Sequence, residues 1–139
     1  MLRYLGIFKV YAGAFYLERN APLGEALSDR AKRLEVQYFR SIKGEDFGPA
    51  TIKLMRKNVN EATMVRLADE IAYHNSLYKD VSPGDRATLT YIPGEGTELA
   101  LNGRILGVIE GAEFASALFS IWIGDQPLDL NFKRQLLGS

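Results

Sequence analysis

Apolar and polar positions alternate between residues 87 and 109, and the alternation is interrupted at two glycine-containing turns. Such alternation is typical of β-strands with one buried face. Asn102-Gly103 stands between two of these segments, and it favours a type I′ turn because both central residues need a positive φ. The turn predicts three cross-strand pairs: Leu101 with Arg104, Ala100 with Ile105, and Leu99 with Leu106. This register gives one face that we expect to be buried: Leu99, Leu101, Leu106 and Val108.

A helical period replaces the alternation after Gly111. Apolar residues recur there at intervals of three and four, the spacing of one face of an α-helix. They are Phe114, Ala117, Leu118, Ile121 and Trp122. We expect this helix to end at Gly124.

Two strand-like segments and two helices are predicted upstream. Residues 3–18 and 33–39 are rich in aromatic and branched side chains, which favour strands. Pro49 suits the first turn of one helix, and Asn60 suits the N-cap of the next. The first of these helices has a predicted inward stripe of Phe47, Thr51, Leu54, Met55 and Asn58. The second helix has a predicted inward stripe of Met64, Val65, Leu67, Ala68, Ile71, Ala72, Asn75 and Tyr78. A last helix is expected after Pro127, with Phe132, Leu136 and Leu137 as its apolar edge.

The order of these segments separates strands from helices instead of alternating them. This order predicts an α+β fold in which an antiparallel β-sheet is covered by helices on one face. A chain of 139 residues without a linker or internal repeat is expected to form a single domain over residues 1–139.

Composition excludes several classes of function. Seventeen basic residues balance seventeen acidic ones, which disfavours an electrostatic nucleic-acid partner. The chain has no cysteine and one histidine, so we expect no cofactor or metal held by those ligands. No apolar run is long enough to span a membrane. Met1 is followed closely by strand-like sequence, so the protein is either cytoplasmic or exported with its signal peptide removed.

Candidate chemistry is sparse. His74 lies at the edge of a helical stripe, where we expect a boundary histidine with a structural hydrogen bond. The alternative is that His74 acts as a general base in catalysis. Arg3 and Lys9 are cations within strand-like sequence, on the same parity as Tyr11. Such charges can protect a sheet edge from aggregation, whereas an arginine in an apolar cleft can hold both oxygens of a carboxylate.

Several segments together resemble the chalcone isomerase-like family, in particular its small bacterial branch. The similar segments are residues 8–18 (FKVYAGAFYLE), 33–40 (RLEVQYFR), 84–92, 93–109, 111–124 and 127–138. The resemblance implies an open-faced β-sandwich, in which a curved antiparallel β-sheet is covered by helices on one face, with a cleft between the sheet and its helices. Plant members close a chalcone into a flavanone without a cofactor, and other branches bind fatty acids without catalysis.

The resemblance also implies roles for particular residues. Arg3 stands where the family has a ligand-facing arginine, and Tyr11 where isomerases have a threonine. True isomerases carry a tyrosine and an asparagine on the helix that matches residues 62–72, and this span contains neither. We therefore expect a non-catalytic domain that binds a small apolar carboxylate such as a fatty acid. Arg3 and Tyr11 would bind the acid group, and Met64 and Leu67 would contribute to the apolar wall.

Two alternatives stay open. The first is a structural or protein-interaction module whose cleft is closed by side chains. The second is an isomerase of the chalcone–flavanone type. The resemblance to exported bacterial members implies a periplasmic location, with the cytoplasm as the alternative.

Overall fold

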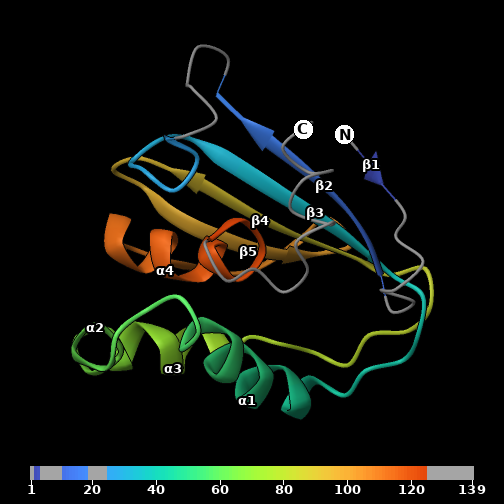
Figure 1. Ribbon diagram of the computed structural model, residues 1–139. Helices are drawn as coiled ribbons and strands as arrows, with labels where there is room; N and C mark the ends of the chain where they lie inside the picture. Colours follow the sequence, from blue (N-terminus) through green and yellow to red (C-terminus); the bar gives the residue numbers. More distant parts are fainter. Residues whose placement is uncertain (1, 4–10, 19–24, 125–139) are drawn as a thin grey trace.

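The computed structural model describes residues 2–3, 11–18 and 25–124. Its strands form one antiparallel sheet in which every strand pairs with its neighbour in sequence (Figure 1). The strands are β1 (Leu2–Arg3), β2 (Tyr11–Leu17), β3 (Lys32–Tyr38), β4 (Arg86–Ile92), β5 (Gly96–Leu101) and β6 (Arg104–Ile109). The two predicted N-terminal strand segments therefore form β1, β2 and β3, and residues 4–10 lie outside the described residues.

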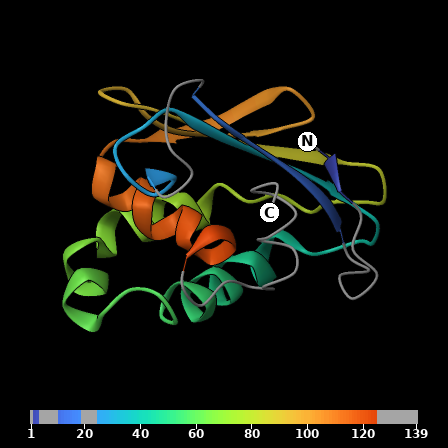
Figure 2. The same cartoon turned by 45° about the horizontal axis from the view of Figure 1, so that its top comes forward.

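The helices all lie on one face of this sheet, which confirms the predicted α+β class (Figures 1 and 2). They are α1 (Gly44–Met55), α2 (Glu61–Arg66), α3 (Ala68–Ser76) and α4 (Ala112–Ile123). In both views α4 lies next to the sheet, and α1 and α2 lie on the far side of α4. The predicted helix after Pro127, with Phe132, Leu136 and Leu137, falls outside the described residues.

The central helix α4 is buried on nearly every side. Phe114 and Leu118 are fully buried, as the predicted stripe requires, and Trp122 is partly buried. Residues off the stripe, such as Phe119 and Ile123, are buried as well, because elements pack against both sides of the helix. The helix ends at Gly124, as predicted.

The β5–β6 turn has the geometry that the sequence predicts. Asn102 and Gly103 both have positive φ, 51° and 81°, as a type I′ turn requires. The pairs next to the turn, Leu101 with Arg104 and Ala100 with Ile105, are those expected.

The predicted register fails beyond those two pairs. An irregularity between Leu99 and Ala100 makes Leu99 pair with Gly107 instead of Leu106. One extra residue in a strand reverses the face of every later side chain. Val108 is therefore 45% exposed, and the prediction that it is buried was wrong; Ile109, next in sequence, is buried instead.

The predicted start of the first helix also needs correction. The helix begins at Gly44, whose N–H donates to Asp80 Oδ1 at 2.7 Å. Pro49 therefore lies inside α1 and not in its first turn. Asn60 is the N-cap of α2, as predicted, and its side chain accepts a hydrogen bond from the Thr63 N–H at 2.8 Å.

The second predicted helix is divided at Leu67, whose backbone (φ −97°, ψ 11°) departs from helical values. The buried residues nevertheless keep a spacing of three and four across this break, and the stripe is narrower than predicted. Met64, Leu67 and Ile71 are buried as predicted. Val65, Ala68 and Ala72 are exposed, so their predicted places in the stripe were wrong.

Two glycines with positive φ should respond differently to an added methyl group. An alanine Cβ at Gly103 (φ 81°) would meet no atom within 4 Å, whereas at Gly96 (φ 113°) it would lie 2.6 Å from the Ile109 carbonyl oxygen. We predict that Gly103→Ala lowers the free energy of unfolding by about 1 kcal/mol. Gly96→Ala should lower it by ~3 kcal/mol, because it adds a clash with backbone to the strain. Urea denaturation checks both values, and equal losses would contradict the predicted contact at Gly96.

Candidate functional site

An apolar cavity of about 390 Å³ lies between the sheet and the helices. Its sheet wall is formed by Leu34, Val36, Tyr38, Ala87, Leu89 and Leu99. Its helix wall is formed by Phe47, Ala50, Thr51 and Leu54 of α1 and by Ile121 and Trp122 of α4. Ile42, Asp46 and Tyr78 complete the lining. Both the size and the apolar lining are typical of sites for small molecules.

The sequence of β3 explains the sheet wall. Alternate residues of a strand point to the same face, and the inward positions of β3 carry Leu34, Val36 and Tyr38. Leu34 pairs with Leu89 of β4, which in turn pairs with Leu99 of β5. These pairs extend one apolar surface across three strands.

Aromatic rings from three elements meet at one end of this cavity. Phe47 of α1 stacks on Tyr78, with ring centroids 4.6 Å apart, and makes an edge contact of 5.8 Å with Tyr38 at the end of β3. Two phenol groups therefore belong to side chains at this end, and Thr51 of α1 also lines the cavity. Apart from Tyr38, the residues of the sheet wall carry no polar side-chain atom.

Behind Tyr78 lies a fully buried histidine. His74 Nε2 lies 2.8 Å from the Tyr78 hydroxyl, and the two rings pack edge to face. The predicted structural hydrogen bond is therefore present, but the predicted boundary position was wrong, because His74 lies inside the core. Burial lowers the pKa of His74 to about 4, so its ring is neutral at pH 7.

Burial also shifts the titration of the tyrosine in this pair. It raises the pKa of Tyr78 to about 12, and a hydrogen bond with Thr51 opposes this rise. Tyr78 is therefore a neutral phenol throughout the physiological pH range. Together the two shifts leave a neutral, hydrogen-bonding pair at the cavity wall.

Strand pairing places the backbones of Arg3 and Tyr11 in line, across the sheet, with two residues that line this cavity. Tyr11 of β2 stands opposite Tyr38 of β3. Arg3 of β1 stands opposite Gly13, which stands opposite Val36. Tyr38 and Val36 both line the cavity. The binding roles of Arg3 and Tyr11 stay predictions.

Met64 and Leu67 occupy a different part of the core. Both are buried, with 5% and 4% of their surface exposed, and neither is among the residues that line the cavity. Their contact with a ligand stays a prediction.

Several lining residues were not found from the sequence as site residues. Phe47 and Tyr78 were expected in inward helical stripes, and Trp122 in the stripe of the last described helix. A stripe shows which residues face inward, but it does not show which of them meet a neighbouring side chain and which border empty space. No signal in the sequence separates the two cases.

A second depression, of about 540 Å³, lies beside the α1–α2 connection and α4. Much of its lining is polar, from residues such as Asn58, Asn60 and Ser116. An apolar ligand would gain little by leaving water there. The cavity between the sheet and the helices is therefore the better candidate site.

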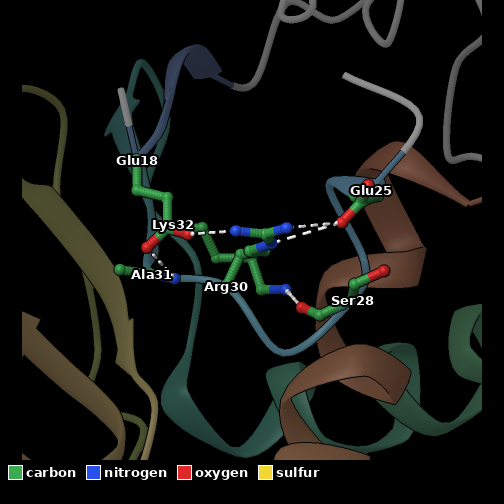
Figure 3. A network of polar contacts seen from close by, with 6 residues as sticks. All are labelled: Glu18, Glu25, Ser28, Arg30, Ala31 and Lys32. Carbon is green, nitrogen blue, oxygen red and sulfur yellow. Dashed lines mark hydrogen bonds and ion pairs between the residues drawn. The ribbon is translucent and has the colours of Figure 1, made fainter. Parts of the chain in front are cut away.

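A network of charged groups lies at the opposite end of β3 from Tyr38 (Figure 3). Arg30 forms ion pairs with Glu18 and Glu25, at 3.1 and 2.8 Å. Beside them, buried Lys32 donates from Nζ to the carbonyl oxygens of Ala26 (2.8 Å) and Ser28 (2.7 Å). These bonds hold the 25–30 turn against the first residue of β3.

Burial lowers the pKa of Lys32 to about 8, and the carboxylates of Asp29 and Glu18 oppose this shift only in part. Its ammonium group lies 5.4 Å from the centroid of the Tyr91 ring and 5.6 Å from that of Phe119. Carbonyl oxygens and ring faces therefore replace water around this cation. We interpret the cluster as a structural anchor of the turn.

Metal-ligating clusters and membrane-spanning helices are both absent from residues 2–3, 11–18 and 25–124. No group of three or more potential metal-ligating side chains comes together in these ranges. None of their helices has the length and apolar character to cross a bilayer.

Two comparisons with known proteins, one with family models and one with solved structures, find similarity. A family model described as chalcone isomerase-like matches residues 1–138. Among solved structures, the fold is similar to that of a fatty-acid-binding protein of Arabidopsis thaliana, with a TM-score of 0.66. The identity is 17%, and the match covers 98% of this chain and 82% of that chain. A search of curated proteins finds no match. These findings confirm the resemblance and the fold predicted from it.

We predict that His74 makes the stability of the protein depend on pH. The pKa of the folded state (about 4) lies below the ordinary value of 6.5, so the unfolded chain binds the proton first as the pH falls. The free energy of unfolding should therefore fall between pH 6.5 and 4, by about 3 kcal/mol from this group.

Because the chain has a single histidine, His74→Gln isolates this effect. Urea denaturation of both proteins at several pH values measures the difference between them. The wild-type protein should lose more stability than the variant as the pH falls from 7 to 4. Parallel curves would contradict a buried, neutral His74.

Proposed function

This chain belongs to the chalcone isomerase-like family, and we propose that it is a non-catalytic member that binds a fatty acid in the cavity between sheet and helices. The supporting observation is the cavity itself. It is lined almost wholly by apolar side chains, and hydroxyl-bearing residues gather at one end. A ligand with an apolar chain and one acidic end has the same distribution of polarity.

The size of the cavity indicates the length of the ligand. A methylene group takes up about the same volume as a water molecule, roughly 30 Å³ in the liquid. A cavity of about 390 Å³ therefore accommodates on the order of a dozen carbon atoms. We propose a medium-chain acid in place of a long-chain one.

The acid group is assigned to the end of the cavity near Tyr38. Residues directly opposite each other in antiparallel strands share a face of the sheet. Arg3 pairs with Gly13, which pairs with Val36 on the next strand. Tyr11 pairs directly with Tyr38. We propose that the Arg3 guanidinium binds the carboxylate and that Tyr11 donates a further hydrogen bond, because charge-assisted pairs of this kind are short and strong. The apolar chain would then extend towards Leu89 and Ile121.

The cavity also bears on the alternative of an interaction module. That alternative requires a core filled by side chains, whereas about 390 Å³ between the sheet and α1 is not filled by the described residues. The binding hypothesis accounts for this space, and the interaction hypothesis does not. Export to the periplasm stays a prediction.

The proposal is tested by measuring the binding of decanoic acid by isothermal titration calorimetry. Ala50→Trp places a large side chain at the cavity lining from an exposed position, so we predict at least a tenfold loss of affinity without unfolding. Ala72→Trp is the matched control, because Ala72 is an exposed helical alanine outside the cavity lining. This control should bind like the wild-type protein.

Arg3→Ala tests the proposed position of the acid group in the same assay. The variant should bind decanoic acid at least tenfold more weakly and should bind decanol as well as the wild-type protein does. Arg104→Ala, on exposed β6, is the control for loss of a positive charge. The proposal fails if the wild-type protein binds no acid, or if Ala50→Trp and Ala72→Trp bind alike.

A further inference from the structure

The strand β6 lies at the end of the sheet, and only one of its two edges is paired. Its neighbour is β5, and no other described strand lies beside it. A free edge presents a row of unpaired backbone N–H and C=O groups to any strand that approaches. Proline and lysine often protect such an edge, and β6 (RILGVI) contains neither. The edge is therefore open to a further strand.

Two exposed apolar side chains lie on the outer face of this strand, which points away from the helices. Ile105 pairs with Ala100, and Val108 pairs with Glu98. Ala100 and Glu98 flank Leu99, which faces the helices, so both point the other way. Ile105 is 59% exposed and Val108 is 45% exposed. A strand that covers them would remove apolar surface from water, which favours association.

The end of β6 near Ile109 borders an acidic surface depression of about 510 Å³. Its lining contains Tyr73 and four carboxylate side chains, and it contains no basic residue. The carboxylates belong to Asp69, Glu70, Glu95 and Glu110. None of them forms an ion pair with a residue that the structure describes. The potential of this end therefore favours a cationic group.

The opposite end of the same strand is basic. Arg104 is exposed, and its side chain forms no ion pair with any described residue. The Arg86 N–H donates to Asn102 Oδ1 at 2.9 Å, so a second arginine belongs to the neighbourhood of the β5–β6 turn. The strand thus carries positive charge where it begins and borders negative charge where it ends.

We propose that β6 pairs antiparallel with β6 of a second copy of this chain, so that two sheets join across a twofold axis. In an antiparallel pair the start of each strand lies beside the end of the other. A strand with opposite charges at its two ends is therefore complementary to its own copy. This self-complementarity identifies the occupant of the edge as a second copy.

The exposed apolar residues define the register of the pair. Ile105 opposite Val108 of the second copy puts both side chains on the outer face, and the symmetry repeats this contact. Arg104 then stands opposite Ile109 of the second copy, which lines the acidic depression. The guanidinium is thereby brought to the carboxylates around Glu110.

Sedimentation equilibrium across the micromolar range tests the proposal. One chain has a mass of 15.5 kDa, and the wild-type protein should reach twice this mass as its concentration rises. Val108→Lys places a charge in the middle of the contact and should leave single chains. Val65→Lys is the matched control, because Val65 is an exposed valine on α2, and this variant should dimerise like the wild-type protein.

Two charge-reversed variants test the antiparallel register. Arg104→Glu brings like charges together at both ends of the contact, and so does the combination of Glu70→Lys with Glu110→Lys. Each variant alone should dimerise at least tenfold more weakly than the wild-type protein. Mixed in equal amounts, the two should form a heterodimer, because each cation then meets a carboxylate again.

Circular dichroism verifies that each variant is folded. A wild-type protein that stays a single chain at every concentration would overturn the proposal, and the edge would then be open to a strand of a different protein. A dimer that Val108→Lys leaves intact, or charge-reversed variants that do not form a heterodimer, would overturn it as well. No residue of β6 lines the apolar cavity, so these results are independent of the binding of decanoic acid.

Discussion

The burial of α4 between the sheet and the other helices is the interaction on which the rest of the structure depends. Each large apolar side chain that it buries stabilises the fold by about 1.5–3 kcal/mol relative to exposure, and Phe114, Leu118 and Phe119 are all almost fully buried. Beside α4, α3 packs directly on β6, so α4 covers only part of the sheet. Helix α4 ends at Gly124, where an added Cβ would lie 2.6 Å from Asn58 Oδ1. The cavity is bordered by the last turn of α4, by the sheet and by α1, so the end of this helix sets one boundary of the site.

Much of this fold could be predicted from local patterns in the sequence. The type I′ turn, the Asn60 cap and the stripe of α4 depend on neighbours within a few residues. One error arises where a local irregularity changes the phase of a pattern: a bulge beside Leu99 moved Val108 to the surface. The bulge has no signature in the sequence, because it depends on how the strand packs against its neighbours. Val65 is exposed for another reason, because the buried stripe of α2 and α3 is narrower than predicted.

The candidate site was less predictable, because a cavity is a property of several elements at once. Tyr78 and Phe47 were predicted to face inward, but their contact depends on the relative position of α1 and the end of α3. The burial of His74 was missed for a related reason. Its stripe contains few large apolar residues, and Phe114 of α4 supplies part of its cover. The binding roles of Arg3 and Tyr11 were predicted from the family resemblance. The strand register places both positions in line, across the sheet, with residues that line the cavity.

The central claim is that an acid lies in the space between β3, β4, α1 and the end of α4. A crystal structure of the protein with 10-bromodecanoic acid tests it most directly, because anomalous scattering locates the bromine at the end of the apolar chain. The account predicts a bromine peak in the cavity near Leu89 and Ile121, with the carboxylate towards the Tyr38 end. A peak in the polar depression beside Asn58 and Ser116, or a cavity that is empty at saturating ligand, would contradict it.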